Sequence, residues 1–238
     1  MLQEIYTGTG TILLYFIVMA SAALIARSRV RIEDEVFRKL LHFILLGSLL
    51  VWTLVFKTWY LAAGTALAFA AAVYPFLKLA EGIRGYSRFV TERKSGELKQ
   101  SLLIVFGMYA LVAALCWGWQ GDKLLALCSI YAWGVGDAAA ALVGKRFGRH
   151  PLEGRHIEGR KSVEGSAAMF TASFICVISI LLVRGGLPWA AYPFIAAVAA
   201  AVSAFTELYS MHGMDTITCP LAAAAVLIPL VQVCGGAL

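Results

Sequence analysis

Charged residues are scarce in this sequence. Asp, Glu, Lys and Arg make up 14% of its 238 residues, and 61% of the residues are apolar, whereas an average soluble domain is ~25% charged and ~45–50% apolar. Mean hydropathy is +0.80, and apolar runs near the length of a membrane span recur from end to end. This composition excludes a soluble globular domain, a disordered chain and a disulfide-stapled secreted module. It predicts an all-α, polytopic integral membrane protein.

Paired cysteines are also absent. The five cysteines stand singly in apolar surroundings, without the spacing or the neighbouring histidines of a zinc site; they are Cys116, Cys128, Cys176, Cys219 and Cys234. We interpret them as small packing residues. The first residues carry no basic segment of the kind that precedes a cleavable signal, so we expect the whole chain to be retained in the membrane.

Eight apolar stretches are long enough to cross a hydrocarbon core of ~30 Å as helices. We place them near residues 9–26, 38–56, 58–77, 101–119, 124–144, 162–183, 187–208 and 218–236. Short links around Lys57 and around Gly185 and Gly186 predict helical hairpins. We therefore expect one transmembrane catalytic domain, residues 1–238, built as a bundle of about eight helices.

The net charge of +6 indicates membrane topology rather than a nucleic-acid partner. Seventeen Lys and Arg residues fall in the links after the first, third and fifth spans, and three fall on the opposite side. The three are Lys57, Lys123 and Arg184. Basic residues favour the cytoplasmic side, so we expect both termini outside and the long basic loops in the cytoplasm. Most tryptophans lie at the predicted outer ends, but Trp133 lies inside a span.

Ionisable groups inside spans cost roughly 2.5–3.5 kcal/mol at a helix centre, so each needs a partner or a function. Five such groups, from five spans, are predicted at one depth near the basic side: His42, Asp137, Glu164, Glu207 and Asp215. A transporter more readily carries such groups near the midplane. Structural interpretations stay open for Asp137 as a packing residue, for Glu207 as a carboxylate that snorkels to the headgroups, and for His42 as a satisfied interfacial residue.

The segment 144–162 combines glycines with six basic residues and ends on a serine that can cap the next helix. Such a loop suits phosphate, because glycines let backbone N–H groups approach oxygens and cations neutralise charge. The candidate phosphate ligands are Lys145, Arg146, Arg149, Arg160, Lys161 and Ser162. A basic loop lying on anionic headgroups is the other interpretation. The segment is not a P-loop, because Arg160 interrupts the pattern and no strand precedes it.

Four blocks of sequence resemble the signature of the membrane polyprenol kinases, which include dolichol kinase, phytol kinase and the CTP-dependent diacylglycerol kinase of fungi. The central block reads Gly136-Asp137-Ala138, Val143-Gly144-Lys145-Arg146-Phe147-Gly148 and Arg160-Lys161-Ser162-Val163-Glu164-Gly165-Ser166. The flanking blocks are Arg38-Lys39-Leu40-Leu41-His42, Arg93-Lys94-Ser95-Gly96-Glu97, and Glu207 with Asp215-Thr216-Ile217-Thr218. The similarity spans about residues 35 to 225. At Thr216 the family pattern has Asn, which puts a role for that side chain in doubt.

The resemblance implies transfer of the γ-phosphate of CTP to the hydroxyl of a membrane lipid, with Mg²⁺ as cofactor. It makes Asp137 the expected main Mg²⁺ ligand, with Glu207 or Asp215 sharing the metal or orienting the hydroxyl. The expected nucleotide-binding residues are Arg38, Lys39, Lys145, Arg146, Arg149, Arg160, Lys161, Ser162 and Glu164. His42 is a candidate for orienting phosphate or the lipid hydroxyl, while Arg38 and Lys39 can also be read as topology charges.

Two other functions fit parts of the same sequence. A CDP-diacylglycerol synthase, which is a cytidylyltransferase, has similar glycine and lysine motifs. After the position of Glu207, however, that family carries a longer stretch with Lys-Asp, a Pro- and Gly-rich part and Asp-Arg-x-x-Asp-Ser. A lipid or anion carrier would need polar residues continuing to the outer face, where we find little beyond Asp122 and Lys123. The identity of the lipid alcohol is not encoded in a readable motif, and the small-residue run 196–201 leaves a homodimer open.

Overall fold

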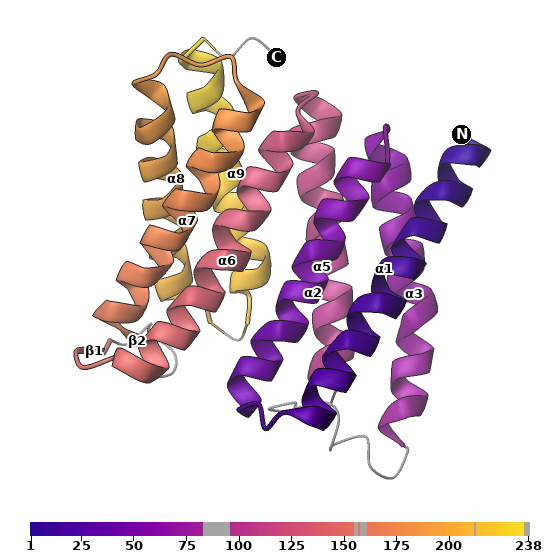
Figure 1. Cartoon of the computed structure of the whole chain (residues 1–238). Helices are drawn as coiled ribbons and strands as arrows, with labels where there is room; N and C mark the ends of the chain where they lie inside the picture. The colour runs from indigo at the N-terminus through magenta and orange to yellow at the C-terminus, as the bar shows by residue number, and fades with distance from the viewer. Residues whose placement is uncertain (83–95, 155–156, 158–160, 212, 236–238) are drawn as a thin grey trace. The chain divides into compact units, whose positions relative to one another are not determined.

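The computed structural model describes residues 1–82, 96–154, 157, 161–211 and 213–235, and it is built of helices (Figure 1). The helices are α1 (Leu2–Arg29), α2 (Asp34–Val55), α3 (Trp59–Glu81), α5 (Glu97–Val112), the π-helix η1 (Ala113–Trp119), α6 (Lys123–Phe147), α7 (Val163–Arg184), α8 (Ala191–Tyr209) and α9 (Asp215–Val233). A short antiparallel hairpin joins β1 (Pro151–Leu152) to β2 (Lys161–Ser162). The all-α class predicted from composition is confirmed.

Within the described residues, eight helical segments are long and apolar enough to cross a membrane, with α5 and η1 forming one of them. Their positions match the eight predicted spans. The largest difference is in the first span, which begins at Leu2 rather than near residue 9. The polar residues that precede the apolar run join the helix because Thr7 and Thr11 satisfy their hydroxyl groups on carbonyls one turn back.

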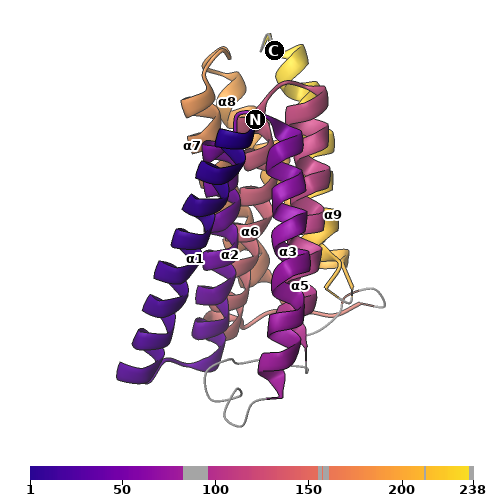
Figure 2. The ribbon, with the colours of Figure 1, turned by 90° about the vertical axis from the view of Figure 1, so that its right-hand side faces the viewer.

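The chain divides into two compact units, Met1–Leu111 and Val112–Leu238. Unit 1 contains α1, α2 and α3 and most of α5. Figure 2 shows α1 and α2 lying side by side, joined by a short link at their lower ends. Aromatic rings fill its interior: Trp52 contacts Phe16, Phe69 and Phe106 at centroid distances of 5.0–6.3 Å. The indole of Trp52 donates to Thr65 Oγ1 at 3.1 Å.

Unit 2 contains η1 and α6 to α9, and the packing of α6 on α7 depends on small residues. A side chain at Gly136 would overlap Ser173 Oγ and meet Met169 Cγ at 3.0 Å. Ser173 in turn donates to the carbonyl of Ala132 at 2.5 Å. The small residues of α6 therefore let the backbone of α7 approach closely, as expected for helices in a membrane.

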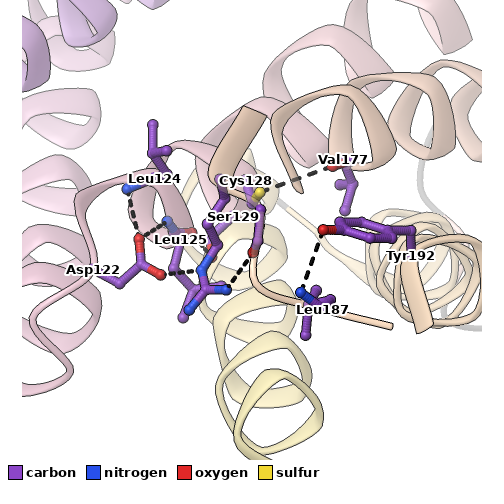
Figure 3. A network of polar contacts seen from close by, with 10 residues as sticks. Asp122, Leu124, Leu125, Cys128, Ser129, Val177, Leu187 and Tyr192 are labelled. Carbon is purple, nitrogen blue, oxygen red and sulfur yellow. Dashed lines mark hydrogen bonds and ion pairs between the residues drawn. The ribbon is translucent and has the colours of Figure 1, made fainter. Parts of the chain in front are cut away.

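A buried ion pair ties α6 to α7 at the end of unit 2 away from the hairpin. Asp122 pairs with Arg184, and the two side chains are 11% and 9% exposed. Asp122 also caps α6, accepting from the backbone of Leu124 and Leu125 at 2.9 and 3.0 Å (Figure 3). The chain leaves α7 through Gly185, whose φ of 72° favours glycine. The predicted hairpin link therefore has a conformational basis.

The β hairpin is a feature that sequence reasoning did not predict. Pro151 pairs with Ser162 and Leu152 with Lys161, which closes the segment between α6 and α7. Figure 1 shows the hairpin at the same end of unit 2 as the link from α8 to α9. The hairpin fixes the position of β2, whose two residues, Lys161 and Ser162, are both expected phosphate ligands.

Candidate active site

Three helices of unit 2 each contribute one carboxylate to the region around Lys161 and Trp133. Asp137 lies on α6, Glu207 in the last turn of α8, and Asp215 at the start of α9. All three are partly buried, and the charge of Glu207 interacts with those of both Asp137 and Asp215. We call these three residues the acidic cluster. Mutual repulsion of three carboxylates makes such a group unfavourable unless cations or protons compensate it.

Lys161 supplies one compensating cation. Its ammonium group lies 2.9 Å from Glu207 Oε1, and both side chains are largely buried, at 17% and 15% exposed. The same group donates to the backbone carbonyl of Glu207. β2 carries Lys161 to this position, so the hairpin places a basic residue of the expected phosphate loop directly against the acidic cluster.

Trp133 holds the third carboxylate of the cluster. Its indole N–H donates to Asp215 Oδ2 at 3.1 Å. Trp133 lies one helical turn before Asp137 on α6, so the two side chains share a helix face. The sequence showed Trp133 as the tryptophan inside a span but did not indicate a partner for it.

Ser162 caps α7 as predicted, accepting from the backbone N–H of Gly165 at 3.1 Å. Its hydroxyl sits among glycines: a Cβ at Gly148 would approach Ser162 Oγ to 2.9 Å, and one at Gly144 would approach it to 3.4 Å. The glycines of the family motif therefore let the end of α6 meet the start of α7. Ser162 itself is buried, and its oxygen is occupied by the helix cap.

Glu164, in the first turn of α7, interacts with His150. Its carboxylate lies 2.7 Å from His150 Nδ1 and accepts from the His150 backbone N–H at 3.3 Å. The pair connects the residue before β1 to the first turn of α7. Sequence reasoning proposed Glu164 for the metal or the cytidine end and did not single out His150, because nothing in the local pattern connects the two.

The other basic residues of the phosphate loop are solvent-accessible at the end of α6 and beyond it. Lys145, Arg146 and Arg149 are exposed, and the guanidinium of Arg146 lies over the ring of Phe147. Arg160 lies outside the residues that the structure describes, as does the stretch 93–95 of the second family block. The described basic side chains are therefore accessible to a nucleotide without displacing packed groups.

The remaining expected residues belong to unit 1. Arg38 pairs with Glu35 on its own helix and with Glu97 at 3.2 Å, which ties α2 to the first residue of α5. Lys39 is buried and His42 is partly buried. The pairing of Arg38 with Glu97 joins two of the family blocks within unit 1.

Oxygen donors of the acidic cluster have the chemistry that Mg²⁺ prefers. In the parts of the chain that are described, no three His, Cys, Asp or Glu side chains converge as a ready metal-binding group. Mg²⁺ in nucleotide sites usually takes one or two carboxylates and completes its shell with phosphate oxygens and water. The donor set of the acidic cluster therefore fits Mg²⁺ that arrives with a nucleotide.

Fold and site together define a class: an integral membrane protein with acidic and basic groups gathered at one end of a helical unit. Comparison with known proteins specifies the class further. The chain is 32% identical over 204 residues to a phytol kinase of Synechocystis sp., which covers 81% of this chain and 78% of the relative. No protein-family model and no solved structure matches it.

The chain therefore belongs to the polyprenol kinase family, and it is a phosphotransferase with an alcohol acceptor. The family assignment made from the motifs is confirmed.

Proposed function

We propose that this protein transfers the γ-phosphate of CTP to the primary hydroxyl of a membrane lipid alcohol, at the cytoplasmic face of the cell membrane. Membership of the polyprenol kinase family supports the reaction type, and the relative described as a phytol kinase favours phytol or a similar prenol as the acceptor. The observation that carries the proposal is the acidic cluster with Lys161 against it. A basic loop lies at the same end of the unit.

The charges of this region divide into two kinds with separate tasks. Lys145, Arg146 and Arg149 are exposed cations at the end of α6, where they are suited to attract and hold a triphosphate. The acidic cluster, in contrast, is suited to a divalent cation and to a reacting hydroxyl. A kinase needs both tasks side by side, because catalysis of phosphoryl transfer is mostly positioning and charge stabilisation.

In the reaction, the oxygen of the lipid hydroxyl forms a bond to the γ-phosphorus, and the bond from that phosphorus to the β–γ bridging oxygen breaks. CDP leaves, and the hydroxyl proton passes to a carboxylate of the acidic cluster. Lys161 exchanges its contact with Glu207 for a phosphate oxygen when the nucleotide enters. Asp137 and Asp215 would hold Mg²⁺, which neutralises charge on the β- and γ-phosphates.

The lipid approaches from the bilayer, since an apolar body can lie among the spans while its hydroxyl reaches headgroup depth. Glu207 lies in the last turn of α8 and Asp215 is the first residue of α9, while Asp137 lies deeper, ten residues before the end of α6. The positions of Glu207 and Asp215 suit a hydroxyl at the membrane surface better than a path across the membrane. At the other end of unit 2, Asp122 and Arg184 neutralise each other.

The test uses purified protein in detergent with Mg²⁺, γ-labelled CTP or ATP, and phytol, farnesol, a longer polyprenol or diacylglycerol. We expect label in a prenol with CTP as donor, and CDP formed in equal amount. Label from ATP alone would overturn the choice of donor. Release of pyrophosphate when phosphatidic acid is supplied, with no labelled alcohol, would instead indicate a cytidylyltransferase.

A further inference from the structure

The indole of Trp133 makes a hydrogen bond that packing alone does not require. Trp133 is 2% exposed, so its N–H needs an acceptor inside the protein. The acceptor is Asp215 Oδ2, at 3.1 Å, on a helix 82 residues further along the chain. A neutral hydroxyl or a carbonyl would have satisfied the same N–H, as Thr65 does for Trp52.

The bond to a carboxylate has two consequences for Asp215. An N–H donor paired with an ionised acceptor makes a stronger bond than a neutral pair, and a buried ring has little freedom to move. The indole occupies one carboxylate oxygen and leaves the other for a further partner. The bond therefore restrains the orientation of the Asp215 carboxylate through Oδ2, and a metal ion would be bound through its other oxygen.

The bond also connects two members of the acidic cluster through one helix. Trp133 and Asp137 lie on the same face of α6, and the charge of Asp215 interacts with that of Glu207, which in turn interacts with that of Asp137. The indole on α6 thereby ties the carboxylate on α9 to the helix that carries Asp137. Loss of a partner that orients a metal-binding side chain typically weakens metal binding about 10- to 100-fold.

We infer that Trp133 is a positioning residue for the metal site of this enzyme. It holds Asp215 so that the acidic cluster binds the divalent cation that accompanies the nucleotide. The inference rests on the proposed function, in which Asp137 and Asp215 hold that cation. It predicts that loss of the indole N–H weakens metal binding, even when the ring is replaced by another ring and the helices stay packed.

The test measures binding rather than turnover. Purified protein, without lipid, is titrated with Mn²⁺ in the presence of the β,γ-methylene analogue of CTP, and bound Mn²⁺ is followed by electron paramagnetic resonance. Trp133→Phe removes the N–H and keeps an aromatic ring. We expect its Mn²⁺ dissociation constant to rise roughly tenfold or more.

Trp52→Phe is the matched control. Trp52 is as buried as Trp133, at 1% exposed, and its indole N–H also has a side-chain acceptor at 3.1 Å. That acceptor is a hydroxyl in unit 1, outside the acidic cluster. The control therefore loses the same ring volume and an indole N–H bond to a neutral hydroxyl, and we expect Mn²⁺ binding within about twofold of the parent.

A second pair of variants separates orientation from folding. Asp215→Asn should weaken Mn²⁺ binding by itself, and adding Trp133→Phe should then change little, because the indole acts through that carboxylate. If Trp133→Phe does not fold, Trp133→Met is compared with Trp52→Met, since methionine also lacks the N–H donor and its flexible side chain fills irregular gaps.

The outcomes are distinct. Equal Mn²⁺ binding by the Trp133 and Trp52 variants, with Asp215→Asn impaired, would overturn the role of Trp133 and leave the proposed metal site standing. Independent effects of Trp133→Phe and Asp215→Asn in the double variant would also overturn it. Absence of Mn²⁺ binding by the parent, or an unimpaired Asp215→Asn, would overturn the metal site and this inference together.

Discussion

Lys161 neutralises Glu207 in the structure, and the same ammonium group is an expected ligand of the nucleotide. Both side chains are largely buried, so the pair has a real electrostatic effect on the cluster, unlike an exposed pair. Lys161 thereby offsets part of the negative charge of the acidic cluster. In the proposed reaction, an arriving phosphate competes with Glu207 for Lys161 and leaves Glu207 available.

Lys161→Ala tests this dual role. We expect the KM for CTP to rise roughly tenfold, because a charge-assisted contact to phosphate is worth about 1.5–3 kcal/mol and each 1.4 kcal/mol is a factor of ten. Steady-state kinetics at a fixed lipid concentration provide the measurement. Lys57→Ala, which removes an exposed lysine from a link of unit 1, is the control. An unchanged CTP dependence in Lys161→Ala would contradict the assignment.

The sequence identified the members of the acidic cluster but not their partners. Asp137, Glu207 and Asp215 could be found because charged residues in apolar spans are rare and costly. Trp133 could not, since its acceptor is 82 residues away and an apolar helix carries no signal for which face meets which neighbour. The pairing of Lys161 with Glu207 was hidden for the same reason.

At the scale of elements, close contact between α6 and α7 positions the loop and the cluster. Three glycines, Gly136, Gly144 and Gly148, occur where α6 faces α7 or its cap. A side chain at Gly136 or Gly148 has no room, whereas one at Gly144 would make ordinary contact with Ser162 Oγ at 3.4 Å. Two of the three glycines are therefore required for packing, whatever the loop binds. The segment 144–162 was interpreted from its glycines and cations as a binding loop, and the structure adds a hairpin and a buried serine cap to that interpretation.

Gly136→Ala should therefore destabilise the protein. The added methyl group overlaps Ser173 Oγ, and moving Ser173 breaks its bond to the carbonyl of Ala132. We expect a loss of about 1–3 kcal/mol, seen as a lower midpoint of thermal unfolding in detergent. Gly64→Ala, in the middle of α3 with nothing within 4 Å of the new atom, should leave the midpoint unchanged or raise it, because alanine favours helix. Equal midpoints for the two variants would refute the packing argument.

The buried pair at the other end of unit 2 makes a second prediction about stability. Asp122→Ala removes both the cap of α6 and the partner of Arg184. We expect a loss of about 3–5 kcal/mol, since a charge is left buried without its partner. Asp34→Ala is the matched control, because Asp34 pairs with Arg27 but is 71% exposed, and its loss should stay below about 1 kcal/mol. Chemical unfolding measures the free energy of unfolding of both variants. Comparable losses of this free energy in the two variants would contradict the account.

At the scale of the whole molecule, the eight spans were predictable because an apolar run of sufficient length is a local property of the chain. The helix ends were less so, since α1 continues to Leu2 through threonines that bond within the helix. Each strand of the hairpin has only two residues, with Pro151 paired to Ser162 and Leu152 to Lys161. Strands this short show no alternation of apolar and polar residues in the sequence. Orientation in the membrane comes from the distribution of basic residues alone.

Labelling of single cysteines tests that orientation. In a variant whose five cysteines are replaced, Trp189→Cys and Arg149→Cys place exposed thiols on links that the charge distribution assigns to opposite sides. An impermeant maleimide should label position 189 in intact cells and position 149 only after permeabilisation. The reverse labelling pattern would contradict the predicted orientation and would indicate that the proposed site faces the outside.

The most direct measurement of the central claim is the turnover of Asp137→Asn, followed as label passing from γ-labelled CTP to the lipid alcohol. The variant keeps the shape of the side chain and loses its charge in the acidic cluster, so we predict turnover at least about a hundredfold below the parent. Asp34→Asn, the same change at an exposed site in unit 1, should retain parental turnover. Folded Asp137→Asn protein with full kinase activity would contradict the account.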